Sequence, residues 1–265
     1  MNIFLREIKA TRKSLLIWIV VMGLLILIAA SKFSAFAGDP EMLKILDSIP
    51  PAMLEVMNAN AFNLTTIIGF YGLMFLYFGL MGAIAAAMWG SDSISKEERD
   101  KTVEFSLVLP VSRSRVVTAK LLAALVNCLV FVLVTWGMAI VSVQNYQPDQ
   151  DFYAFLRLEM LAMFLIELIF LAIGLLLSCG LKNHKIVSSM AVGIILVTYF
   201  FSIIVKMNKD FAFLKNFSPF YYYDAGEMYR NGHLNGMYVG FSVAIVMVCV
   251  IAAYWMYNKR DLYTP

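Results

Sequence analysis

Six long apolar stretches constrain the fold of this chain more than any other feature of its sequence. They lie at about 15–37, 64–89, 116–143, 155–179, 187–205 and 237–257. A helix rises about 1.5 Å per residue, so roughly 20 apolar residues cross a hydrocarbon core about 30 Å thick. A chain of 265 residues that is 61% hydrophobic and 15% charged also has too little polar surface for a soluble domain. The sequence therefore predicts an all-α integral membrane protein, in which residues 1–265 form one domain with six transmembrane helices.

The basic residues predict the orientation of these spans. With the N-terminus inside, 14 of the 21 Lys and Arg residues fall on the cytoplasmic side and 7 on the outer side. Cytoplasmic segments carry the excess of basic residues, so both termini are predicted to be cytoplasmic. The first apolar run ends in "AFA" at 35–37, like a cleavable signal peptide, but it is longer than a signal-peptide core. An uncleaved first span is the preferred interpretation.

Three segments between the spans have a recognisable pattern. Residues 2–13 alternate apolar and basic positions at helical period, which predicts an elbow helix lying in the cytoplasmic interface. Residues 38–63 predict two short amphipathic helices on the outer surface. Residues 206–236 form an outer segment crowded with Phe and Tyr, which we expect either to anchor at the headgroup level or to form an exit gate for cargo. In the second span, small residues recur from Gly72 to Gly90, which suits close helix packing within the chain or across a dimer.

The most polar part of the chain, residues 90–115, is predicted to be a cytoplasmic loop between the second and third spans. Its first part continues at helical period, Thr102 can cap a short transverse helix, Pro110 ends that helix and Ser112 can cap the third span. The transverse helix carries an apolar strip that includes Phe105 and Leu107. Solvent alone does not favour such a strip, so we expect a cytosolic partner to cover it.

This loop resembles that of the permease subunits of ABC-2 type exporters, a bacterial family with six transmembrane helices. The matching residues are Glu98, Thr102, Glu104, Leu107, Pro110, Val111, Ser112, Arg113 and Lys120. Lys101 departs from the pattern, because the family commonly has Gly there. The six-span layout, the basic elbow, the prolines of the outer helices and "SPFYYY" before the last span are also similar to that family.

The resemblance implies a type V exporter-like fold whose transverse "coupling" helix sits in a cleft of a separate cytosolic ABC ATPase. The residues expected to couple to the ATPase are Glu97, Glu98, Arg99, Lys101, Thr102, Glu104, Phe105, Leu107, Pro110 and Arg113. No "GxxxxGK[ST]" phosphate loop occurs, so we expect this chain to hold no cofactor and the partner to use ATP and Mg²⁺. Two ATPase subunits and a second permease, identical or homologous, would complete the transporter in a bacterial plasma membrane.

Polar residues inside the spans are the candidates for contact with cargo. An acidic residue at the middle of a span is costly, which makes Glu167 a functional candidate by default. It either faces the pathway or is hydrogen-bonded to Asn127 or Thr198 inside the bundle. Glu159 is expected nearer the interface, paired with Arg157. The residues assigned to the substrate pathway are Glu167, Asn127, Phe220, Tyr221 and Tyr222.

Other functions find less support in the sequence. "HExxH" and "GxSxG" are missing, and both histidines and all three cysteines lack metal-ligand or disulfide spacing, so neither a catalytic site, a metal site nor a nucleic-acid partner is expected. A stand-alone secondary transporter or channel that uses Glu167 for ion coupling is the alternative. For the exporter, the aromatic outer segment favours an amphipathic or hydrophobic cargo such as a peptide or an antibiotic.

Overall fold

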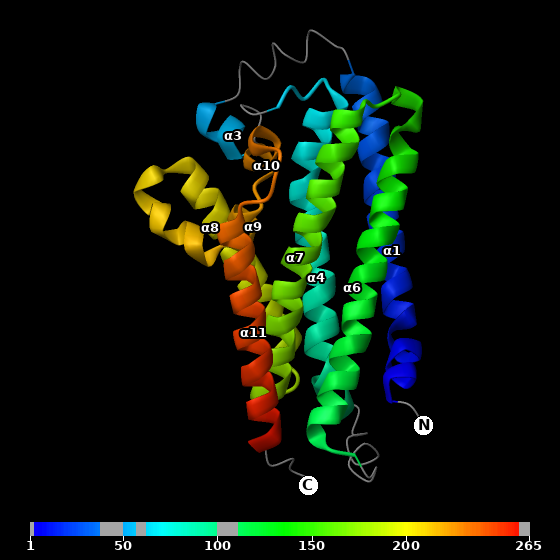
Figure 1. The fold of residues 1–265 in the computed structure, drawn as a ribbon, viewed down its shortest axis with the longest axis vertical. Coiled ribbons are helices and arrows are strands. Elements are labelled where there is room, and N and C mark those ends of the chain that lie inside the picture. The colour runs from blue at the N-terminus through cyan, green and yellow to red at the C-terminus, as the bar shows by residue number, and fades with distance from the viewer. Residues whose placement is uncertain (1–2, 38–49, 57–61, 100–110, 260–265) are drawn as a thin grey trace.

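Six long helices form the framework of the protein. The computed structural model describes residues 3–37, 50–56, 62–99 and 111–259, and this part of the chain contains helices and connecting segments but no strand (Figure 1). The long helices are α1 (Ile3–Phe36), α4 (Ile67–Arg99), α6 (Arg113–Val143), α7 (Gln150–Gly180), α8 (Val187–Met207) and α11 (Gly236–Lys259). Each is long and apolar enough to cross a membrane. The prediction of an all-helical chain with six long apolar helices is therefore confirmed.

Shorter helices gather at the end of the bundle away from Ile3 and Lys259, the first and last described residues (Figure 1). They are α3 (Pro51–Val56), the 3-10 helices η1 (Gln144–Tyr146) and η2 (Lys209–Phe217), α9 (Pro219–Tyr222) and α10 (Ala225–Asn231). Helix α3 lies in the segment where two outer helices were expected; residues 38–49 and 57–61 lie outside the described residues. The aromatic segment 206–236 holds η2, α9 and α10 between α8 and α11.

The N-terminal segment differs from the expected elbow. One α-helix continues without interruption from Ile3 to Phe36 and covers both the expected elbow and the first span. The sequence contains no Pro here and no Gly before Gly23, so nothing in it breaks the helical backbone. The expectation of a separate helix over 2–13 is thus corrected: within the described residues, 3–13 form the first turns of α1, whose charged side chains contact neighbouring helices.

The core is centred on α4 and α7, which share the most extensive contact in the protein. Helix α1 packs mainly on α6, α11 mainly on α7, and α8 on both central helices. In Figure 1 this places α1 and α6 on one side of the central pair and α8 and α11 on the other. Helix α7 is the most deeply buried of the six, whereas α1 and α11 present most of their apolar side chains outward, as lipid-facing helices do.

Two glycines allow α4 and α7 to approach backbone to backbone. A Cβ atom added at Gly90 would lie 2.3 Å from the carbonyl oxygen of Leu171, and one added at Gly174 would lie 2.5 Å from that of Ala87. No side chain fits at either distance, so only glycine allows the two backbones to approach this closely, as small residues do between membrane helices. The small-residue strip of α4 is therefore used, at its Gly90 end, for packing within the chain.

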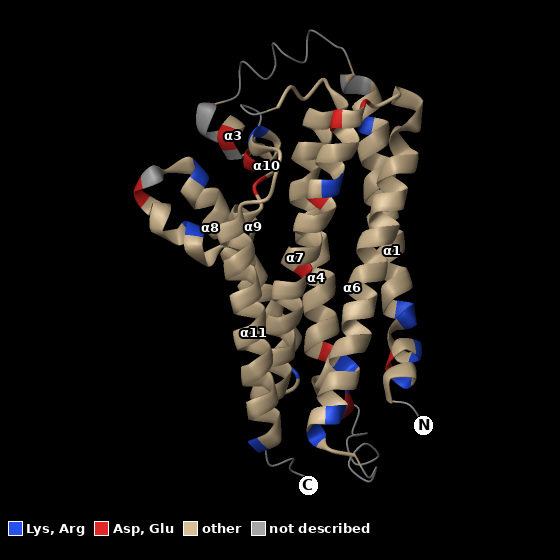
Figure 2. Ribbon diagram, viewed as in Figure 1, with Lys and Arg blue, Asp and Glu red and all other residues tan. Residues whose placement is uncertain are grey.

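Both ends of the bundle carry charged residues, and basic residues gather beside the chain termini. Figure 2 shows Lys and Arg on the ends of α1, α6 and α11 that lie beside the chain termini, while most of the length of these helices is uncharged. Because α1 begins and α11 ends there, the first and last described residues lie at the same end. This is the end that contains the two helix termini leading into residues 100–110.

Candidate functional site

A buried lysine joins three helices at the end of the bundle that carries the chain termini. Lys120 lies two turns into α6 and is only 1% exposed. Its Nζ atom is 3.0 Å from Oε1 of Glu97 on α4 and 3.3 Å from Oε2 of Glu7 on α1, and it donates a hydrogen bond of 2.7 Å to the carbonyl of Ser93. Arg6 completes the group, with Nη2 3.0 Å from the same Glu97 oxygen. We call Arg6, Glu7, Glu97 and Lys120 the foot cluster.

The foot cluster ties the last turns of α4 to α1 and α6. Glu97 and Glu7 are 16% and 13% exposed, so their charges are only partly screened by solvent. An ion pair at such a depth depends on its partners, because removing one leaves a charge with little compensation, which typically costs 3–5 kcal/mol. The foot cluster therefore joins the end of α4 to the first turns of α1 and α6 through charged contacts.

The start of α6 is also fixed, in this case to the end of α11. The side chain of Ser112 accepts a hydrogen bond from the backbone N–H of Arg115, which caps the helix as expected. Arg113 donates from Nη1 to the carbonyl oxygens of Tyr257 at 3.3 Å and Asn258 at 3.4 Å. These carbonyls belong to the last turn of α11, where a cation is favoured by the helix dipole.

The residues expected to contact an ATPase fall into two groups. The structure places Glu97 in the foot cluster, Arg99 in an exposed pair with Asp92 at 3.4 Å, and Arg113 on the end of α11. The side chain of Glu98 and the residues Lys101, Thr102, Glu104, Phe105, Leu107 and Pro110 lie outside the described residues. Arg6 and Glu7 were not anticipated as site residues; their one signal was a pair of opposite charges beside the first apolar run.

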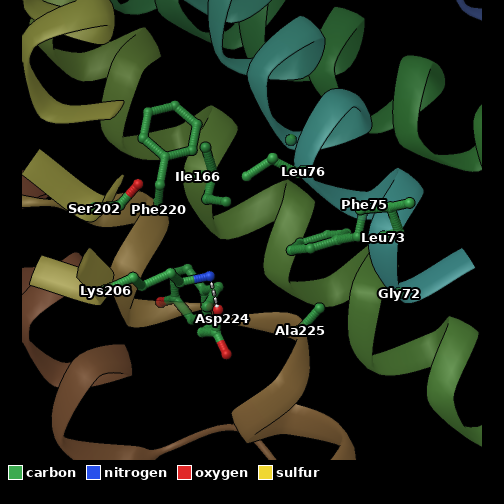
Figure 3. A pocket seen from close by; sticks show the side chains of 12 residues that line it. Gly72, Leu73, Phe75, Leu76, Ile166, Ser202, Lys206, Phe220, Asp224 and Ala225 are labelled. Carbon is green, nitrogen blue, oxygen red and sulfur yellow. Dashed lines mark ion pairs between the residues drawn. The ribbon is translucent and has the colours of Figure 1, made fainter. Parts of the chain in front are cut away.

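A small cavity lies at the opposite end of the bundle, among α4, α7, α8 and the aromatic segment (Figure 3). Its volume is about 20 Å³, room for about one water molecule. Phe220 and Ile166 line one part of it and Lys206 and Asp224 another, and the last two form an ion pair (Figure 3). In this conformation the cavity is too small for cargo, and its wall includes a charged contact between α8 and the aromatic segment.

A larger, open groove of about 840 Å³ runs between the start of α7 and α10. Its wall is formed by apolar side chains, two arginines and one aspartate. They are Phe155, Leu158, Leu161, Met228 and Tyr229 together with Arg157, Arg230 and Asp151. The groove thus combines apolar surface with charge at one end of the bundle.

The residues assigned to a substrate pathway form two groups, one in the aromatic segment and one in the interior of the bundle. Phe220 packs against Tyr199, with ring centroids 5.5 Å apart, and Tyr222 stacks on Tyr238 at 4.8 Å. Burial raises the pKa of the Tyr221 and Tyr222 hydroxyl groups above the usual 10, so both are neutral at physiological pH.

Glu167 and Asn127 lie elsewhere, fully buried in the interior of the bundle. Neither of the hydrogen bonds considered for Glu167 is present: Thr198 donates to carbonyls of its own helix, and the side-chain nitrogen of Asn127 has no partner in the described part of the chain.

Comparison with protein families decides the identity of the chain. The model of the ABC-2 family transporter proteins matches residues 1–262. The chain belongs to the ABC-2 transporter family. The resemblance noted in the loop sequence is thereby confirmed, and this ABC-2 protein is a multi-pass membrane permease component, a non-catalytic transmembrane subunit. ABC-2 permeases work with ABC ATPase subunits in the membrane. Comparison with curated proteins gives no match.

Proposed function

We propose that this ABC-2 permease is the transmembrane half of an ATP-driven exporter and that residues 90–115 are its contact with the ATPase. The observation that supports this most is the fixing of both helix ends that flank residues 100–110. Glu97 near the end of α4 is held by Arg6 and Lys120, and Arg113 at the start of α6 is held by the end of α11. Because both ends are fixed to neighbouring helices, a displacement of the segment between them would move those helices as well.

The conformational step follows from the same contacts. ATP binding, with its Mg²⁺, would close the ATPase pair and displace the segment between α4 and α6. The foot cluster carries that displacement into α1, and Arg113 carries it into α11. The helix bundle then shifts between inward-facing and outward-facing populations, as in other two-state transporters. In this proposal the permease binds no nucleotide and needs no cofactor of its own.

The charge distribution supports a cytoplasmic position for this end of the bundle. Lys and Arg gather on the ends of α1, α6 and α11 beside the chain termini (Figure 2). Cytoplasmic segments of membrane proteins carry this excess, so both termini and the foot cluster would face the cytosol and its ATPase. We place the protein in the plasma membrane of a bacterium, paired with an identical or homologous permease and two ATPase subunits.

An amphipathic cargo agrees best with the opposite end of the bundle. The groove beside α10 offers apolar walls with Arg157 and Arg230, and nearby Tyr222 of the aromatic segment stacks on Tyr238 of α11. Such surfaces suit a molecule with an apolar body and a polar group, for example a peptide or an antibiotic. Because the cavity holds only about 20 Å³, cargo would enter there only after α8 and the aromatic segment separate.

Co-purification tests the proposed ATPase contact. Leu107 and Glu104 are both replaced by Arg in the tagged full-length permease, and the ATPase subunit retained after gentle extraction is measured. The matched control is Asn183→Arg in the exposed turn between α7 and α8. We expect at least a tenfold loss of ATPase from the double variant and none from the control. Equal retention in both, with both permeases folded, would refute the assignment of the contact.

A further inference from the structure

The interior of the bundle contains polar side chains that have no hydrogen-bond partner. Within the described ranges, the buried side-chain atoms without a hydrogen-bond partner are Nδ2 of Asn127, Oγ1 of Thr135 and both carboxylate oxygens of Glu159 and Glu167. Asn127 and Thr135 lie on α6, and the two glutamates lie on α7. We call these four residues the buried seam. An unpartnered polar group in an apolar interior is strongly destabilising, so these atoms need a partner.

The seam has two levels along the helices. The carboxylate of Glu167 packs over Gly82 of α4, where an added Cβ would lie 2.9 Å from Oε1, and its polar neighbour is the thiol of Cys128 on α6. Glu159 lies eight residues earlier on α7, about 12 Å along the helix axis. On antiparallel α6, Thr135 lies seven residues beyond Cys128, about 10.5 Å in the same direction. Glu167 is thus level with Cys128 of α6, and Glu159 is roughly level with Thr135.

Glu159 is next to a chain of hydroxyl groups. The phenol of Tyr71 on α4 lies near its carboxylate and is 2.5 Å from the Oγ atom of Ser142, which in turn donates 2.8 Å to the carbonyl of Ala139. The expected pairing of Glu159 with Arg157 at the interface is wrong. Residues two apart on a helix point in different directions, so Glu159 faces the core at 0% exposure while Arg157 lines the outer groove.

Among the residues that the structure describes, no basic side chain forms an ion pair with Glu159 or Glu167. The ion pairs seen in the described ranges all involve other carboxylates, and the titratable groups that face the seam are Tyr71 from α4 and Cys128 from α6. A metal cation would require several oxygen ligands, yet the described residues contain no group of three His, Cys, Asp or Glu side chains. A proton requires one oxygen and removes the charge altogether.

We propose that Glu159 and Glu167 are proton-binding sites, each carrying a proton while α4, α6 and α7 are packed as in this structure. The protons exchange with solvent when the helices separate, because a hydrated carboxyl group ionises at neutral pH. A conformation that opens the seam therefore releases protons, and the balance between closed and open packing depends on pH. The inference concerns the permease alone and holds whether or not the proposed ATPase contact is correct.

Infrared spectroscopy of the full-length permease in detergent tests the proposal. At about pH 8, far above the usual glutamate pKa of about 4.3, an exposed carboxyl group shows no carboxylic-acid C=O band. We expect the wild-type protein to show this band. Glu159→Gln and Glu167→Gln should each remove about half of it, and the double variant should remove all of it. Glu227→Gln is the control, because Glu227 is exposed and its Oε1 is 2.6 Å from Arg230; it should leave the band unchanged.

Two results would overturn the proposal. One is a wild-type spectrum at this pH without the acid band. The other is a band that appears only when Na⁺ and K⁺ are replaced by choline, because a monovalent cation would then be the ligand. If the Gln variants do not accumulate, wild-type protein grown with ¹³C-labelled glutamate decides the question, since a glutamic-acid band shifts with the label and any other band stays in place.

Discussion

The charge of Lys120 should contribute more to stability than that of any exposed lysine. Replacing it by Met keeps the length and apolar volume of the side chain and removes the ammonium group. The ammonium is 1% exposed and contacts Glu7, Glu97 and the carbonyl of Ser93. Breaking a buried ion pair typically costs about 3–5 kcal/mol. We expect the lower end, about 3 kcal/mol, because Arg6 still pairs with Glu97 and both carboxylates are partly exposed.

The assay is equilibrium unfolding of the purified permease in detergent, followed by tryptophan fluorescence. Lys185→Met is the matched control, because Lys185 is exposed in the turn between α7 and α8 and its loss should change the free energy of unfolding by less than about 0.5 kcal/mol. The cycle of Lys120→Met with Glu97→Gln should give a coupling energy of about 1–3 kcal/mol, because the two groups are in direct contact. A loss for Lys120→Met no larger than that of the control would refute the foot cluster as a structural joint.

Three further predictions concern helix packing, the α6–α11 contact and the aromatic segment. Gly174→Ala should lower the unfolding temperature of the permease by several degrees, because no Cβ fits 2.5 Å from a carbonyl oxygen, whereas Gly193→Ala meets open space and should not lower it; equal shifts would contradict the close approach of α4 and α7. Arg113→Gln should destabilise by about 1 kcal/mol, read from the same unfolding curves, because partly exposed charged hydrogen bonds are lost; a loss equal to that of Arg115→Gln would count against the contact with α11. Burial raises the pKa of Tyr222, so its proton is lost at higher pH in the folded than in the unfolded protein, and this contribution to stability falls as pH rises above about 10. An alkaline absorbance titration should show a late phase that Tyr222→Phe makes smaller, because other buried tyrosines such as Tyr221 also contribute to it; an unchanged titration would refute the burial.

The long helices could be predicted from the sequence because length and hydropathy determine which segments cross a membrane. The helix ends were less accessible. Helix α4 continues ten residues beyond the expected end of the second span; hydropathy alone excludes this charged stretch from a span, and the helical period of the stretch is what predicted the extension. The joined α1 was missed for a related reason: basic residues near a span indicate an interface, but they do not say whether the helix bends there.

The contacts of the site depend on packing that a single sequence does not contain. Lys120 was recognised as part of the loop pattern, yet its partner Glu7 is 113 positions away and only the packing of α1 on α6 brings the two together. The small residues of α4 left two possibilities open, packing within the chain or between two chains. The close approach of Gly90 to α7 shows that they are used for packing within the chain. Glu159 was placed at the interface from its distance to the span end, but the direction in which it points from α7 puts it in the core.

The most direct test of the account is the native mass of the complex extracted gently from the membrane of a cell that makes this permease. We predict a mass equal to two membrane subunits plus two ABC ATPase subunits. The same measurement on the Leu107→Arg, Glu104→Arg double variant should show the membrane subunits without the ATPase pair. A wild-type permease that moves solute across a liposome membrane and whose native mass includes no nucleotide-hydrolysing subunit would contradict the account.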